Sequence, residues 1–141
     1  MKLEELYKKT ILKHYRNPKN LGALNSATIS VEDENSLCGD NIQLRLLIQE
    51  DAVDNIKFEG DGCSISIASA SVMTEIVKGK SVDEIKKITK QILKVMNECE
   101  HLDFLDKYTD LSAFKDIIKH KARSNCAMLP WSALEKALKK E

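Results

Sequence analysis

The sequence predicts an α+β fold in which an N-terminal helix comes first, a three-stranded antiparallel sheet follows, and several α-helices pack against that sheet. Two observations support this prediction. Residues 28–59 contain three short segments with a period of two, and the residues on either side have the period of a helix. The chain has 141 residues, a length that suits one domain. We therefore expect a single domain over residues 1–141.

Alternating apolar and polar residues mark the three expected strands. They fall at residues 28–32, 41–49 and 55–59, and only Leu47 interrupts the alternation. This pattern is typical of antiparallel strands with one buried side. The apolar positions on the expected inner side are Ile29, Val31, Ile42, Leu44, Leu46, Ile48, Ile56 and Phe58.

A helix is expected before the strands and two more directly after them. Residues 3–15 place apolar side chains on one face, and Pro18 should end that helix, because a residue before proline avoids the helical region. Residues 63–77 are small and apolar and predict the second helix. Ser81 is the expected N-cap of the third, with Glu84 three residues later.

The third helix should extend to Cys99, which continues its apolar stripe and is expected to be at least half-buried without a chemical role. Leu111, Phe114 and nearby isoleucines predict a further helical stripe. A last helix is expected to start near Cys126 and to end near Lys139.

Charge and hydropathy exclude several classes of partner. Acidic and basic residues balance at 22 each, so the net charge gives no attraction to nucleic acid or to an anionic membrane. No apolar run approaches the roughly 18 residues that cross a bilayer. The charged start lacks the apolar segment of a secretory signal. We expect a cytoplasmic protein, in a compartment where thiols stay reduced.

Four cysteines in a reducing compartment suggest metal binding or reactive thiols more than disulfides. Cys38 lies beside Gly39 in an expected loop between strands. Cys63 lies at an expected helix N-terminus, where the helix dipole favours a thiolate. Cys126 lies at another expected helix start, three residues after Arg123, whose charge also favours a thiolate.

Asp40 could complete a metal site with these thiols. Zinc accepts thiolate sulfur and carboxylate oxygen in a four-coordinate shell, which Cys38, Asp40, Cys63 and Cys126 could supply. The alternative is that the cysteines are ordinary small core residues. No CxxC pair exists, so spacing alone leaves a shared site as a hypothesis.

Short motifs surround these cysteines in a characteristic order. They are HYRNPKN at residues 14–20, CGD at 38–40, FEGDGCSIS at 58–66 and ASAS at 68–71. In this order they resemble the U-type iron–sulfur cluster assembly family, which includes the IscU scaffolds, the SufU proteins and the N-terminal domain of NifU. The resemblance extends over nearly the whole chain and implies a SufE/NifU-like fold.

Within the family, the chain is similar to the SufU branch. The stretch between Cys63 and Cys126 is longer than in the scaffold branch, with the extra residues expected near 101–116. The scaffold branch has a histidine directly before its third cysteine, where this chain has Asn125. The Leu-Pro-Pro-Val-Lys segment of the scaffolds is also absent.

The resemblance implies that Cys38, Asp40, Cys63 and Cys126 are zinc ligands. It also implies that a SufS-type cysteine desulfurase passes persulfide sulfur to Cys38, with Arg123 orienting a thiolate or a partner carboxylate. A downstream cluster-assembly complex would then receive the sulfur. Whether such a protein counts as an enzyme stays open; if it does, it is a sulfurtransferase.

Two other functions remain open. The same ligands could assemble a transient [2Fe–2S] cluster, or bind iron, in a scaffold that passes its cluster on. Asn125 and the longer chain argue against this alternative. The second open function is that of a small domain with a purely structural zinc. Asp40 argues against it, because closed structural sites favour cysteine and histidine.

Pro130 departs from the family pattern. It lies four residues after Cys126, inside the expected last helix. It has no N–H to donate to the Cys126 carbonyl, and it can kink the helix there.

Overall fold

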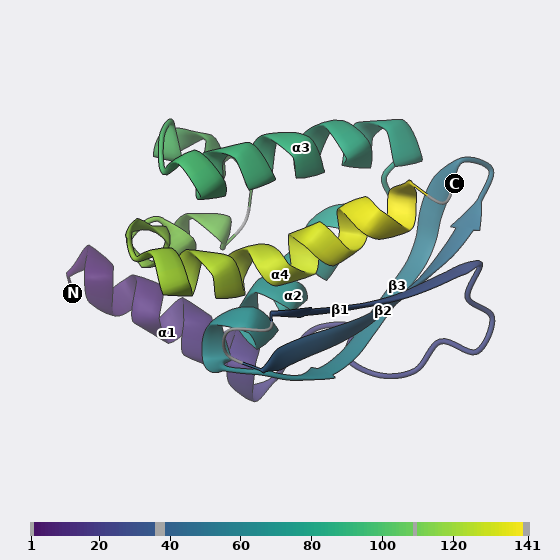
Figure 1. The fold of residues 1–141 in the computed structure, drawn as a ribbon, viewed down its shortest axis with the longest axis horizontal. Helices are drawn as coiled ribbons and strands as arrows, with labels where there is room; N and C mark the ends of the chain where they lie inside the picture. The colour runs from purple at the N-terminus through teal and green to yellow at the C-terminus, as the bar shows by residue number, and fades with distance from the viewer. Residues whose placement is uncertain (1, 36–38, 109, 140–141) are drawn as a thin grey trace.

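The computed structural model describes residues 2–35, 39–108 and 110–139, and it confirms the predicted α+β fold (Figure 1). The sheet has the strand order β1-β2-β3, and both neighbouring pairs are antiparallel. The elements in chain order are α1 (Leu3–Arg16), β1 (Ile29–Asn35), β2 (Asp40–Gln49), β3 (Ala52–Asp61), α2 (Ser64–Val77), α3 (Val82–Glu98), the 3-10 helices η1 (Leu102–Lys107), η2 (Leu111–Phe114) and η3 (Ile117–Lys119), and α4 (Lys121–Leu138).

The strands follow the predicted alternation but are longer than predicted at the edges of the sheet. The turn between β2 and β3 is tight, because Glu50 and Asp51 both adopt a positive φ, as in the turns that suit hairpin twist. The register shifts between Leu47 and Ile48, where the sequence alternation also broke. Because of this irregularity, Val53 and Ile56, which are three residues apart in β3, are both buried.

The helices cover one face of the sheet. In Figure 1, α4 runs across the middle of the molecule, with α2 behind it and α3 on the far side from the strands. Helix α4 contacts β1 and β2, and α2 contacts β3. The side chains between these layers are fully buried; the largest are Leu44, Leu46, Ile56, Phe58, Met73 and Trp131.

Two local predictions about helix ends can be compared directly. The Ser81 hydroxyl accepts a hydrogen bond from the Glu84 N–H at 3.2 Å, which confirms the predicted cap of α3. Cys99 ends that helix in a left-handed conformation and is half-buried, as predicted.

The prediction of an α-helix through residues 111–118 is wrong. This part of the chain forms the short 3-10 helices η2 and η3. Residues three apart lie on the same side of a 3-10 helix, as they nearly do in an α-helix. Leu111 and Phe114 are therefore both fully buried, and the spacing that suggested an α-helix fits the 3-10 helix equally well.

The predicted start of the last helix is also wrong. Helix α4 begins at Lys121, so Cys126 lies inside it, beyond its first turn. The helix continues through Pro130, which is buried. Pro130 has no N–H to donate to the Cys126 carbonyl, and the Ser66 hydroxyl of α2 lies 3.3 Å from that carbonyl oxygen.

Candidate metal and sulfur site

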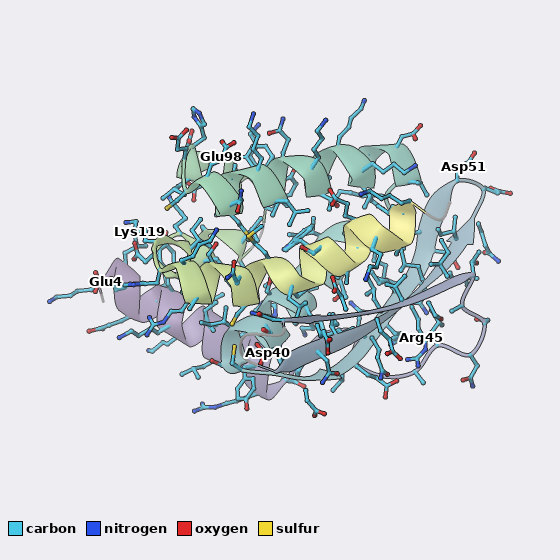
Figure 2. All side chains as sticks on the ribbon, in the orientation of Figure 1. Glu4, Asp40, Arg45, Asp51, Glu98 and Lys119 are labelled. Atoms are coloured by element: carbon cyan, nitrogen blue, oxygen red, sulfur yellow. The ribbon has the colours of Figure 1, made fainter. Side chains whose placement is uncertain are left out.

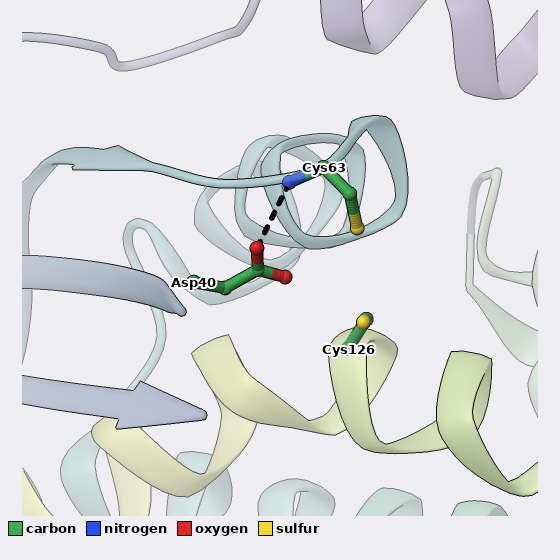
Figure 3. A group of neighbouring side chains, drawn as sticks. All are labelled: Asp40, Cys63 and Cys126. Carbon is green, nitrogen blue, oxygen red and sulfur yellow. Dashed lines mark hydrogen bonds between the residues drawn. The ribbon is translucent and has the colours of Figure 1, made fainter. Parts of the chain in front are cut away.

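Three of the predicted site residues come together at one end of the sheet (Figure 3). Asp40, Cys63 and Cys126 each offer one possible ligand atom, and these atoms all lie within 4.8 Å of one another. They come from β2, the start of α2 and the interior of α4. Figure 2 shows Asp40 at the end of the sheet remote from Asp51 in the β2–β3 turn.

Asp40 is the first residue of β2 and is only 5% exposed. A buried carboxylate needs hydrogen-bond donors, and the start of α2 supplies two. The Cys63 N–H donates to Oδ1 at 3.2 Å, and the Ser66 hydroxyl donates to Oδ2 at 2.6 Å. Figure 3 shows Oδ2 pointing toward the space between the two thiols.

Cys63 is the N-cap residue of α2 and is exposed. Its thiol thus lies at the N-terminal end of α2, the position that the sequence predicted. Gly62 lets the chain pass close to the carboxylate. A Cβ at Gly62 would lie 3.3 Å from both Asp40 Cγ and Ser66 Cβ, tighter than ordinary van der Waals contact.

Cys126 is 7% exposed and faces α2. It lies beyond the first turn of α4 and not at the helix start that the sequence predicted. Two serines of α2 contact backbone carbonyl groups of α4 at and beside Cys126. The Ser66 hydroxyl lies 3.3 Å from the Cys126 carbonyl oxygen, and the Ser69 hydroxyl donates to the Ala127 carbonyl at 2.6 Å.

Cys38, the fourth predicted ligand, lies outside the described residues. Its neighbours in sequence show where the chain leaves and re-enters the sheet. Asn35 at the end of β1 pairs with Asp40 at the start of β2, and the Gly39 N–H donates to the Asn35 carbonyl at 2.9 Å. Gly39 has a φ of +74°, consistent with the tight turn expected there.

Arg123 is exposed in the first turn of α4, three residues before Cys126. It lines a groove together with Ser64, which directly follows Cys63, and with His120. The other side of this groove is formed by α1, including Tyr7 and Ile11. Arg123 is thus linked to the site in two ways: it precedes Cys126 in α4, and it shares a groove with Ser64, the neighbour of Cys63. Its predicted role stays a prediction.

The donor atoms fit the metal that the sequence suggested. Two thiols and one carboxylate within reach of one another match the sulfur and oxygen donors that zinc accepts. The same thiols are also the usual ligands of iron–sulfur clusters. The group formed by Asp40, Cys63 and Cys126 could therefore bind a metal ion.

Sequence reasoning missed Ser66, although it lies within a motif that was singled out. It is 4% exposed and contacts all three described site residues. Its position one helical turn after Cys63 was a usable signal, because residues three apart lie on the same side of a helix.

The fold and this site define a class of small α+β proteins with cysteine and aspartate side chains gathered at the end of a sheet. A model of the NifU-like N terminal domain matches residues 6–140. The chain belongs to this family, whose members include iron–sulfur cluster assembly proteins.

Several relatives are similar along nearly their whole length. The zinc-dependent sulfurtransferase SufU of Bacillus subtilis (strain 168) is 42% identical over 139 residues, which cover 99% of this chain and 93% of that protein. The iron–sulfur cluster assembly scaffold protein IscU of Thermotoga maritima is 38% identical over 140 residues, covering 99% and 97%.

Solved structures show the same fold. A crystal structure from Fervidobacterium islandicum AW-1, described as a candidate iron–sulfur cluster assembly scaffold protein for the SUF system, superposes with a TM-score of 0.84. It is 32% identical, and the match covers 97% of this chain and 99% of that one. Among the described residues of this protein, no helix is both long and apolar enough to cross a membrane.

Proposed function

We propose that this protein is a zinc-dependent sulfur acceptor of iron–sulfur cluster assembly, acting as a single domain in the cytoplasm. The observation that carries the proposal is the meeting of Asp40, Cys63 and Cys126, whose donor atoms lie within 4.8 Å of one another. The similarity to a zinc-dependent sulfurtransferase at 42% identity supports the same activity.

Cys38, Asp40, Cys63 and Cys126 would hold the zinc. Cys38 is two residues before Asp40 in the sequence, and Asn35, three residues before Cys38, pairs with Asp40 in the sheet. A bound zinc ion would act as a Lewis acid that keeps the thiols deprotonated. Asp40 is the oxygen donor among the thiols, and its hydrogen bonds hold its carboxylate toward them.

Cys38 would accept the sulfur from a SufS-type cysteine desulfurase. Its thiolate attacks the terminal sulfur of a persulfide on the desulfurase cysteine. The sulfur–sulfur bond in that persulfide breaks, and its electron pair leaves with the desulfurase thiolate. Cys38 then carries the transferred sulfur as a persulfide, which a downstream cluster-assembly complex would take up. By this proposal the protein is a sulfurtransferase.

Arg123 would assist from the groove beside the site. It is exposed, and its guanidinium is not held in any ion pair identified among the described residues. A planar guanidinium can pair with a partner carboxylate or attract a persulfide anion. Its position one turn before Cys126 would bring that charge to the edge of the site.

A scaffold that assembles a [2Fe–2S] cluster is the second candidate. The similarity to the Thermotoga maritima scaffold at 38% identity favours it, as does the supply of thiolates. Asn125 opposes it, because an amide replaces the histidine that precedes the third cysteine in the scaffold branch.

Desulfurase turnover separates these candidates. A SufS-type desulfurase is assayed with and without the zinc-loaded protein, in the absence of iron. Strong stimulation that disappears in Cys38→Ala supports the sulfur acceptor, and Cys99→Ser is the matched control that should stimulate like the wild type. No stimulation by the wild type would contradict the proposal, and anaerobic cluster reconstitution would then test the scaffold.

A further inference from the structure

The hydroxyl of Ser66 lies at the centre of the candidate site. Its Oγ is 2.6 Å from Asp40 Oδ2, 3.3 Å from the Cys126 carbonyl oxygen and 3.7 Å from Cys63 Sγ. Ser66 is 4% exposed, so water cannot easily replace these contacts. One side chain on α2 thus touches β2, α4 and its own helix start at the point where the possible ligands meet.

A serine hydroxyl has one proton, and the distances show where it goes. The Asp40 oxygen is nearer than the Cys126 carbonyl by 0.7 Å (3.3 minus 2.6), and hydrogen bonds to a carboxylate are the shorter and stronger kind. The hydroxyl therefore donates chiefly to Asp40, and the Cys126 carbonyl oxygen is the more distant acceptor. The Ser66 hydroxyl thus fixes the orientation of the Asp40 carboxylate more than it fixes the position of the α4 backbone.

The oxygen that Ser66 holds is also the one that faces the thiols. Oδ1 of Asp40 accepts from the Cys63 N–H, and Oδ2 points toward the space between Cys63 and Cys126 (Figure 3). Two thiolates would repel a carboxylate, and a neighbouring donor offsets part of that repulsion. With both oxygens held by donors, the carboxyl plane is fixed before any metal arrives.

We propose that Ser66 is a positioning residue that orients Asp40 as the oxygen ligand of the metal site. The inference rests on the proposed zinc binding and adds a residue that acts through a ligand without being one. Residues that hydrogen-bond to metal ligands typically change affinity by about 10- to 100-fold when they are removed. Ser66 thereby tunes how firmly the single oxygen donor stays among the sulfur donors.

Ser69 provides a matched control one turn along the same helix. It is fully buried, and its hydroxyl donates to the Ala127 carbonyl of α4 at 2.6 Å. Like Ser66, it joins α2 to α4, but its hydrogen bond goes to the α4 backbone and not to Asp40. A loss of general packing between α2 and α4 would therefore affect Ser66→Ala and Ser69→Ala alike.

The test measures zinc affinity by competition with a chromophoric chelator. Ser66→Ala should weaken binding by about 10- to 100-fold. Ser69→Ala should stay within about threefold of the wild type, and Ser66→Thr, which keeps the hydroxyl, should recover most of the affinity. Equal affinity in Ser66→Ala and the wild type, or an equal loss in Ser69→Ala, would overturn the inference.

A double-mutant cycle shows whether Ser66 acts through Asp40. In an Asp40→Ala background, adding Ser66→Ala should cause little further loss of zinc affinity, because the carboxylate it positions is gone. The d–d absorption bands of the cobalt-substituted Ser66→Ala protein should also shift relative to the wild type. Fully additive losses would overturn the inference alone, whereas a wild-type protein that binds no zinc would overturn the proposed function and this inference with it.

Discussion

The Nε2 atom of His14 lies 2.8 Å from Oδ2 of Asp110, although the two residues are 96 positions apart in the sequence. The other ring nitrogen, Nδ1, lies 2.7 Å from the Ser71 hydroxyl. His14 is 2% exposed and thus joins α1, α2 and the turn that precedes η2. Since the Asp110 carboxylate accepts, Nε2 is the donor in that bond, and the Ser71 hydroxyl is the partner of Nδ1.

This link predicts that Asp110→Ala destabilises the fold. The variant leaves a buried imidazole nitrogen without its carboxylate partner, which costs about 1–3 kcal/mol. Urea denaturation should show a lower midpoint with an unchanged slope. Asp106→Ala is the control, since it removes an exposed ion pair with Lys115 that is worth at most about 1 kcal/mol. Equal effects of the two variants would contradict the structural role of His14.

Gly60 lies in β3 beside β2 and should not tolerate a side chain. A Cβ there would lie 2.3 Å from the Asn41 carbonyl oxygen, so the two strands would have to separate. We expect Gly60→Ala to lower the free energy of unfolding by at least about 2 kcal/mol, measured by urea denaturation.

The control for this prediction is Gly22→Ala. Gly22 also has a positive φ, of 133°, but a Cβ there would meet nothing within 4 Å. Its substitution should show the cost of backbone strain alone, about 1 kcal/mol or slightly more. A Gly60→Ala protein as stable as Gly22→Ala would show that the β2–β3 pairing is looser than the structure indicates.

The proposed site predicts which cysteine variants of the protein retain zinc. Cys38→Ala, Cys63→Ala and Cys126→Ala should each lose most of the bound zinc, because each would remove one of the four proposed donors. Cys99→Ser should keep it, since Cys99 ends α3 and is not among the grouped donors. The zinc content of each variant is measured by atomic emission after gel filtration. Full retention of zinc by all three alanine variants would refute the shared site.

Removal of zinc should lower the thermal stability. Binding to the folded state alone, at a metal concentration 100 times the dissociation constant, adds about 2.7 kcal/mol. A chelator should therefore decrease the melting temperature of the wild type, and added zinc should restore it. Cys126→Ala should melt at the same temperature with and without chelator; a chelator-dependent shift in that variant would place the stabilising metal elsewhere.

Local sequence features determined much of the secondary structure. The alternation in residues 41–49 sufficed to predict β2, and the Ser81 and Glu84 pair located the start of α3, because strand period and helix capping depend on neighbours within a few residues. The predicted start of the second helix at Cys63 falls on the N-cap residue of α2. The motifs around the cysteines also identified the family.

Other features depended on contacts between distant segments. A spacing of three residues could not distinguish an α-helix from the 3-10 helices at residues 111–119, and the start of α4 at Lys121 had no local capping signal. The hydrogen bonds from His14 to Asp110 and from Ser66 to Asp40 join residues far apart in the sequence. Helical spacing could place Ser66 beside Cys63, but it could not place it beside Asp40.

The sequence by itself thus determined the class of fold, the family and the residue types of the site, because these are written in short patterns. Only the tertiary structure decided that Asp40, Cys63 and Cys126 meet and that Ser66 lies among them. The physical reason is that packing α2 and α4 against the sheet sets these distances, and packing is a property of the whole chain.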